Sequence, residues 1–355
     1  PTRQVAGSCC PVNLPFGRSQ PFSGLKSRMK LFRHVLRSTA AALLLISYAV
    51  GSTAFADAAY PTRPIKLVVP YPAGGASDAV ARMIGEKLQQ AWGQPVIIDN
   101  RPGASGMIGT QAVTRAPADG YTVLVHNTVL IQQPAVMEKL PYDPFSDLLP
   151  VVLTLRTNNL FVVPGDSPAK TLKEFIGLAK ANPKQHIYGS YGIASAAHLH
   201  GELFRQQAGV DLAHIPFQGS APIVTSLAGG QLSSAFIDIP TALPHIKSMR
   251  ALAVAGSQRI PELPDVPTFT ELGYRSFEPS GWHGMFMPAG TPPAVAQKFA
   301  QGVSSALRMP DVAAKLRALG VSPGGGTPDE FVRQIKDDAP VYAEIARTAN
   351  IRITP

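Results

Sequence analysis

Cysteine is nearly absent from the 355-residue sequence: the only two, Cys9 and Cys10, stand side by side near its start. The remaining sequence therefore offers no disulfide, no cysteine nucleophile and no thiolate metal site. It also lacks an apolar run of the roughly 18 residues that would suggest a membrane-spanning helix. With 45% apolar residues, the chain is nevertheless too hydrophobic to be disordered as a whole. We expect a soluble, globular body of about two domains, stabilised by core burial.

Acidic residues are missing from the first 56 positions, whereas seven basic residues lie there. These are Arg3, Arg18, Lys26, Arg28, Lys30, Arg33 and Arg37. Without them, 25 basic residues face 23 acidic ones, and the net charge falls from +9 to +2. The basic excess thus belongs to a leading segment, and a nucleic-acid-binding surface is not supported.

This leading segment has the parts of a secretory signal peptide. Met29-Lys30 with Arg33 and Arg37 forms a positive region, Ala40 to Val50 forms an apolar region, and Ala54-Phe55-Ala56 is a small-residue cleavage site. We predict export with cleavage after Ala56, the alternative being an uncleaved anchor. Residues 1–28 are interpreted as an upstream extension outside the mature protein. No cysteine follows to accept a lipid, so we expect a free periplasmic protein.

The first part of the mature chain alternates strands with helices. Residues 65–69 form a short apolar run typical of a buried strand, and a helix is predicted from Ser77, as N-cap, to a stop at Gly93. A second strand at 95–99 completes a βαβ unit and therefore predicts a parallel sheet. After the loop 100–106 and a short helix, a third strand is expected at 121–125. This is the pattern of a doubly wound α/β lobe.

The same alternation restarts after a connection near residues 150–165 and predicts a second lobe. Strands are expected at 160–163, 187–189, 213–217, 232–237 and 251–255, and helices from 171 and at 195–208 and 221–227. Three further helices are predicted at 293–307, 310–319 and 328–350. Because few strands remain, we expect this tail to pack on the first lobe. The predicted fold is therefore α/β with two lobes: 57–155, 156–268, and a return to the first lobe over 269–355.

Two glycine-containing loops stand between a strand and a helix, one in each lobe. Residues 72–78 read Pro-Ala-Gly-Gly-Ala-Ser-Asp, and residues 189–195 read Gly-Ser-Tyr-Gly-Ile-Ala-Ser. Backbone N–H groups at such helix starts suit an anion, for example a carboxylate. The alternative is that each turn serves geometry alone. If the lobes face one another, the two loops form a carboxylate clamp at the carboxyl ends of the strands.

Other chemistries find less support. The spacing G-x-G-x-x-G is absent, as is the P-loop pattern, so no nucleotide cofactor is expected. Ser190 lacks a nucleophile-elbow motif, although a hydrolase using Ser190 or Ser195 with His198 remains a rival hypothesis. His198 and Glu202 have helical spacing but no further clustered ligand for a metal.

Polar residues also follow other predicted strands. Asp238 could accept a hydrogen bond from a ligand or cap the next helix. The loop 217–220 could offer an aromatic ring and an amide, and Asn127 with Thr128 ends the third strand of the first lobe. His245 and Trp282 are interpreted as structural.

Many ordered motifs resemble one family, the Bug-type periplasmic solute receptors, which are the substrate-binding components of tripartite tricarboxylate transporters. In the first lobe they are Tyr60-Pro-Thr-Arg-Pro-Ile, Val69-Pro-Tyr-Pro-Ala-Gly-Gly75, Asn100-Arg-Pro-Gly-Ala-Ser-Gly106 and Ala118-Asp-Gly-Tyr-Thr122. Later motifs include Tyr188-Gly-Ser-Tyr-Gly, Gly201-Glu-Leu-Phe204, Arg250-Ala-Leu-Ala-Val254, Asp265-Val-Pro-Thr268 and Pro288-Ala-Gly-Thr-Pro292. The resemblance covers nearly the whole mature chain.

The resemblance implies a type II periplasmic-binding-protein fold, also called a Venus flytrap, that closes on a small carboxylated metabolite. It implies that the first-lobe turn holds a carboxylate with help from ordered water, while second-lobe loops discriminate the rest of the ligand. The candidate ligand-binding residues are Ala73, Gly74, Gly75, Ser77, Asp78, Asn127, Ser190, Ala194, Ser195, Phe217, Gln218, Gly219 and Asp238. Ala194 stands where the family often has glycine, so the ligand's identity does not transfer.

The sequence-based hypothesis is thus an exported, monomeric receptor that performs no chemistry and needs no cofactor or metal. Its expected partners are a small carboxylate and integral-membrane transporter subunits, with no nucleic acid. Two alternatives remain open at this stage: a receptor that feeds a sensor kinase, and a periplasmic serine hydrolase.

Overall fold

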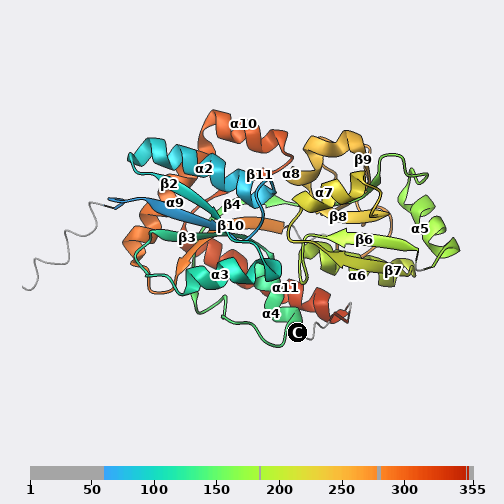
Figure 1. The fold of residues 1–355 in the computed structure, drawn as a ribbon, viewed down its shortest axis with the longest axis horizontal. Helices are drawn as coiled ribbons and strands as arrows, with labels where there is room; N and C mark the ends of the chain where they lie inside the picture. Colours follow the sequence, from blue (N-terminus) through green and yellow to red (C-terminus); the bar gives the residue numbers. More distant parts are fainter. Residues whose placement is uncertain (1–59, 184, 278–280, 349, 352–355) are drawn as a thin grey trace, which may run out of the picture. The chain divides into compact units, whose positions relative to one another are not determined.

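The computed structural model describes residues 60–183, 185–277, 281–348 and 350–351. The predicted upstream extension and signal peptide lie outside these residues. The described part of the chain forms two β-sheets, one of six strands and one of five, each covered by helices (Figure 1). No helix within it is long and apolar enough to span a membrane.

The first sheet begins with the predicted βαβ unit. Strand β1 (Ile65–Val69) pairs in parallel with β2 (Val96–Asn100) and with β3 (Thr122–Asn127), so the parallel prediction is confirmed. Helix α2 (Ala76–Trp92) connects β1 to β2 and ends at Gly93 in the left-handed conformation. The prediction of Ser77 as N-cap is wrong. Gly75 is the N-cap, and the Ser77 side chain instead bonds to His283.

Three antiparallel strands complete the first sheet in the order β11-β4-β10-β3-β1-β2. They are β4 (Leu148–Thr157), β10 (Gly281–Pro288) and β11 (Ser322–Gly325). Sequence analysis predicted a connection where β4 lies and did not predict β10 or β11. Each of these strands contains glycine, proline or both. These residues weaken the alternation of apolar and polar residues from which a strand is predicted. Strand β10 lies at the centre of the sheet, between β3 and β4.

Helices cover both faces of the first sheet. Figure 1 shows α2 and α10 (Pro310–Ala318) above the sheet and α3 (Met107–Thr114) below it. The remaining helices of this sheet are α4 (Val129–Val136), α9 (Pro293–Arg308) and α11 (Pro328–Thr348). A capping box begins α11: Thr327 N donates to Glu330, and Glu330 N donates to the Thr327 hydroxyl.

The second sheet has the strand order β7-β6-β8-β5-β9. Its strands are β5 (Asn159–Pro164), β6 (His186–Ser190), β7 (Leu212–Pro216), β8 (Ser234–Asp238) and β9 (Met249–Ala255). Its helices are α5 (Leu172–Ala181), α6 (Ala196–Ala208), α7 (Ala221–Ala228) and the single turn α8 (Ile239–Ala242). Every strand and helix predicted in this region is present, with ends shifted by a few residues.

An aromatic cluster fills the core of the second sheet. Phe161 contacts Phe175, Phe204 and Phe236 at ring-centroid distances of 5.0–5.1 Å, and Phe269 stacks on Phe236 at 5.7 Å. All five rings are fully buried or nearly so. Each such pair adds roughly 0.5–1.5 kcal/mol beyond burial of its area. The strand ends of this sheet are therefore held on a rigid core.

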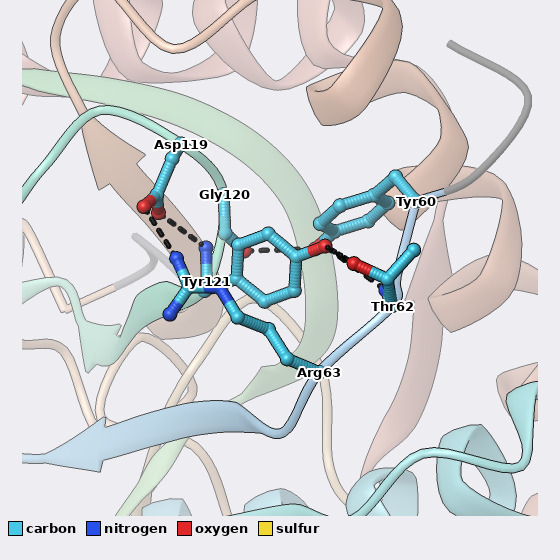
Figure 2. Close-up of polar contacts among 6 residues, drawn as sticks. All are labelled: Tyr60, Thr62, Arg63, Asp119, Gly120 and Tyr121. Atoms are coloured by element: carbon cyan, nitrogen blue, oxygen red, sulfur yellow. Dashed lines mark hydrogen bonds and ion pairs between the residues drawn. The ribbon is translucent and has the colours of Figure 1, made fainter. Parts of the chain in front are cut away.

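The first described residues form a cluster on the first sheet that we call the N-terminal clamp: Tyr60, Thr62, Arg63, Asp119, Gly120 and Tyr121 (Figure 2). The buried Tyr60 hydroxyl donates to the carbonyl of Gly120 at 2.8 Å. Arg63 pairs with Asp119 at 2.6 Å and lies 4.0 Å from the centre of the Tyr121 ring. The clamp therefore ties the chain to the sheet just before β1 begins.

The chain crosses between the sheets twice within the described residues. The first crossing is short, because β4 ends at Thr157 and β5 begins at Asn159. The second follows β9 and leads to β10. Helical side chains pack across the junction: Leu199 of α6 belongs to the same buried cluster as Trp282 and Tyr342 of the first sheet.

Candidate functional site

A small cavity lies where the two sheets meet. Both sheets contribute to its lining: Tyr71, Pro72, Gly75, Ala76, Ser77, Asn127 and His283 from the first, and Tyr191, Gly219, Ser220, Ala221, Pro222 and Asp238 from the second. Its volume of about 20 Å³ is close to what one water molecule occupies. The two sheets therefore approach closely at this place, and no lysine or arginine among the described residues lines the cavity.

Two helix N-termini converge on the cavity, one from each sheet. Gly75, Ala76 and Ser77 are the N-cap and first two residues of α2. Ser220, Ala221 and Pro222 hold the same positions in α7, where only Ser220 and Ala221 have a backbone N–H because Pro222 lacks one. The first N–H groups of a helix have no partner within the helix and carry a partial positive charge. Opposed helix starts of this kind can hold an anion without a cationic side chain.

The polar side chains that line the cavity beside the start of α2 are neutral. Ser77 Oγ and His283 Nδ1 lie 3.1 Å apart in a hydrogen bond. Burial lowers the pKa of His283 to about 4, so this ring is uncharged at neutral pH. Nearby, the Tyr71 hydroxyl donates to Asn127 Oδ1 at 3.0 Å, and burial raises the pKa of Tyr71 well above its usual value. These groups can donate to or accept from a ligand without adding charge.

Among the described residues, Asp238 is the carboxylate that lines the cavity. It accepts hydrogen bonds from the Ser220 hydroxyl, from Thr241 N at 3.1 Å and from Thr241 Oγ1 at 2.7 Å. Burial raises its pKa above the ordinary value, although the hydrogen bonds oppose this shift. The sequence left capping and ligand contact as alternatives. The structure shows that Asp238 caps α8 and that the same residue faces the cavity.

Of the predicted site residues, the structure brings Gly75, Ser77, Asn127, Gly219 and Asp238 together around the cavity. Ala73, Gly74, Asp78, Ser190, Ala194, Ser195, Phe217 and Gln218 do not line it. Several of these residues form hydrogen bonds that fix the loops beside the cavity, while neighbouring residues of the same loops line it.

Asp78 is an example of such support. Its carboxylate accepts from Gly74 N at 3.0 Å, from Asn100 Nδ2 at 3.0 Å and from Arg82 Nε at 3.0 Å. Burial alone would raise its pKa, but Arg82 and the other donors hold the pKa below its ordinary value. Asp78 therefore fixes the turn before α2 rather than facing the cavity.

In the second-lobe loop 190–195, the serine hydroxyl groups form hydrogen bonds within their own lobe rather than facing the cavity. Ser195 caps α6 by accepting from His198 N at 3.2 Å and donates to Gly192 O at 2.6 Å. Ser190 Oγ lies 2.7 Å from Nε2 of His214, whose ring stacks on that of His198 at 4.2 Å, so the histidine that Ser190 contacts is His214 rather than the predicted His198. Ala194 adopts φ +63°, a left-handed conformation that explains why glycine would suit this position. The loop lines the cavity with Tyr191 instead.

Pro72, Ala76, Tyr191 and Ser220 line the cavity from loops that were predicted to contact the ligand, although they were not among the named candidate residues. Tyr71, Ala221, Pro222 and His283 line it from positions that were not predicted. A signal existed for α7, since serine followed by proline near a helix start is typical of an N-terminus. His283 had none, because β10 itself was not predicted.

Comparison with known proteins identifies the family. Residues 80–351 match the tripartite tricarboxylate transporter family receptor. The chain belongs to this family. Among curated relatives, the receptor is 35% identical to Protein BugT of Bordetella pertussis over 298 residues, which cover 83% of this chain and 91% of BugT.

Solved structures show the same two-lobed fold, so the predicted fold class is confirmed. Rpa4515 of R. palustris, solved with adipate, has a TM-score of 0.79 and 33% identity, covering 83% of this receptor and 100% of that chain. MatC of Rhodopseudomonas palustris, solved with bound malate, has a TM-score of 0.77 and 30% identity, covering 81% and 99%. Both of these relatives therefore bind dicarboxylates.

Proposed function

We propose that this receptor is periplasmic, binds a small carboxylate in the cavity between its sheets and delivers it to the membrane subunits of a tripartite tricarboxylate-type transporter. The observation that carries the proposal is the pair of opposed helix N-termini, α2 and α7, around a cavity without cationic side chains. The adipate and malate in the related structures support the same ligand class.

The proposed mechanism is closure of the two lobes on the ligand. A ligand that contacts both helix starts gains its full set of hydrogen bonds only when the lobes close, so it shifts the population toward the closed form. The two lobes approach closely here, since a Cβ atom placed on Gly219 would lie 3.7 Å from Cβ of Tyr71. A membrane partner could then recognise the ligand-bound form by its shape.

A thermal-shift and calorimetric screen tests this proposal. Malate, adipate and other mono-, di- and tricarboxylates are titrated into the purified protein, together with the uncharged diamides of the dicarboxylates as controls. A carboxylate that binds the folded protein but not the unfolded chain raises the unfolding temperature, roughly in proportion to the logarithm of its concentration. A saturable response to a carboxylate, absent for its diamide, is expected. No response to any acid would contradict the proposal.

The alternatives receive less support from the structure. Against the serine hydrolase stands the burial of Ser190 and Ser195, which lie outside the cavity and whose hydroxyls donate to the Gly192 carbonyl, although Ser190 also contacts His214. Signalling through a sensor kinase would use the same ligand-driven closure. Transport assays in cells that lack the receptor separate these two outputs.

A further inference from the structure

A second polar cavity lies at the junction of the two sheets, around the segments that cross between them. It has a volume of about 250 Å³. Its lining comes from the end of β4 (Arg156, Thr157, Asn158), from residues 257–261 after β9, and from Gly320 and Ser322 beside β11. It shares no lining residue with the small cavity at the helix N-termini.

Two arginines face this junction cavity from different sheets. Arg156 lies on β4 of the first sheet, and Arg259 follows β9 of the second. No carboxylate is among the lining residues, whereas Ser257, Ser322 and Gln258 add neutral hydrogen-bonding groups. The lining therefore contains two guanidinium groups and neutral polar groups, unlike that of the first cavity, although Arg259 also forms an ion pair with Glu271 outside the lining.

Both guanidinium groups retain donors beyond their contacts within the protein. Arg156 donates from Nη2 to Gln334 Oε1 at 2.6 Å. Arg259 donates from Nε to Glu271 at 2.9 Å and from Nη1 to Pro264 O at 2.9 Å. A guanidinium has five N–H donors in a planar fork that matches oxyanions. Donors of each arginine are thus left for a ligand.

We propose that the junction cavity binds a small free oxyanion, such as inorganic phosphate or a short carboxylate, between Arg156 and Arg259. Because the two arginines belong to different sheets, the bound anion contacts both lobes next to the segments that cross between them. It therefore favours the present arrangement of the lobes and acts as an effector of closure rather than as the transported ligand.

The test is calorimetric titration of the purified protein with inorganic phosphate. We expect saturable binding that weakens at least tenfold in Arg156→Gln and in Arg259→Gln. Arg333→Gln, an exposed position outside both cavities, is the matched control and leaves binding unchanged. Ser77→Leu, which obstructs the first cavity, also retains phosphate binding. Repeating the titration with succinate distinguishes a tetrahedral anion from a carboxylate as the preferred occupant.

A variant that binds phosphate more tightly provides a test that misfolding cannot imitate, because a misfolded variant would lose binding. The Glu271 carboxylate accepts hydrogen bonds from Nε of Arg259. Glu271→Gln removes the negative charge that competes with the anion for Arg259, so it is expected to tighten phosphate binding several-fold. The proposal is overturned if neither phosphate nor succinate binds saturably. It is equally overturned if binding persists in both arginine variants or is lost only in Ser77→Leu.

Discussion

Ser77 and His283 stand 206 positions apart in the sequence, yet their side chains form a 3.1 Å hydrogen bond in the wall of the cavity. The bond joins the N-terminus of α2 to β10. This strand belongs to the first sheet, although it follows all strands of the second sheet in the sequence. The same helix start that can hold an anion is thereby fixed to the centre of the sheet.

Replacing His283 tests the value of this pair. His283→Ala leaves the buried Ser77 hydroxyl without its partner, which should lower the free energy of unfolding by about 1–3 kcal/mol and weaken binding of a cavity ligand. His283→Gln keeps an amide that can bond to Ser77 and should retain more of both. Urea unfolding measures stability and calorimetry measures affinity. Equal stability of the two variants would show that the hydrogen bond contributes little.

The buried histidines make stability depend on pH. Burial lowers the pKa of His126, His200 and His283 to about 4 and that of His214 to about 3. In the unfolded chain, histidine has a pKa of about 6.5. As the pH falls below this value, the unfolded state takes up protons first, so stability is fully present above pH 6.5 and declines toward pH 4.

Each histidine with a folded pKa near 4 should cost about 2 kcal/mol of stability between pH 7 and pH 5. Urea unfolding at pH 7, 6 and 5 measures the total. His245→Gln is the matched control, because His245 is exposed, and its replacement should leave the slope unchanged. An unfolding free energy that stays constant between pH 7 and pH 5 would refute the assignment of these rings as neutral.

The proposed closure of the lobes should depend on the absence of a side chain at Gly192. Gly192 has φ +149°, and a Cβ atom placed there would lie 3.0 Å from Oγ of Ser105 in the opposite lobe. Gly192→Ala is therefore expected to hold the loops apart and to weaken ligand binding about tenfold, a loss that corresponds to roughly 1.4 kcal/mol. Calorimetry with malate or adipate measures the change.

The contact partner offers a rescue. Ser105 itself has φ +52°, which glycine adopts more readily, so Ser105→Gly removes the clash and should restore part of the affinity in the double variant. Gly177→Ala is the matched control, since a Cβ atom there meets nothing within 4 Å. Failure of Ser105→Gly to restore any affinity would mean that the effect of Gly192→Ala does not arise between the lobes.

Asp238 combines capping with its place in the cavity. Asp238→Asn keeps one acceptor oxygen for Thr241, places an NH2 group that can donate to the Ser220 hydroxyl oxygen, and removes a carboxyl that is costly to bury in charged form. Stability should therefore remain within about 1 kcal/mol of the wild type. Asp238→Ala loses the cap of α8 and leaves Ser220 unpaired, which should cost about 1–3 kcal/mol. Thermal unfolding distinguishes the two. Equal losses would argue against a hydrogen-bonding role.

Local sequence patterns predicted most of the α/β alternation. The strands β1 and β5 to β9 are short apolar runs between clear turn residues, and Gly93 and the capping boxes mark helix ends by local chemistry alone. Strands β4 and β10 escaped prediction because Pro150, Gly281 and Gly284 interrupt their patterns. Their strand character comes from pairing with one another and with β3, a long-range relationship that no local window contains.

The site was harder to predict than the fold for the same reason. The position of Ser77 near a helix start was visible, but its partner His283 lies on an unpredicted strand. In the second lobe, serines at 190 and 195 suggested ligand contacts, whereas their hydroxyls bond to nearby groups of their own lobe. The helix that reaches the cavity is α7. Which of several helix starts faces the other lobe is decided by the packing of whole elements.

The most direct test of the central claim is a crystal structure of the protein with bound malate or adipate. We predict carboxylate oxygens within hydrogen-bonding distance of the backbone N–H groups at the start of α2, between the two lobes, with no lysine or arginine in contact. A carboxylate bound outside this cavity, or held there by a cationic side chain, would contradict the account.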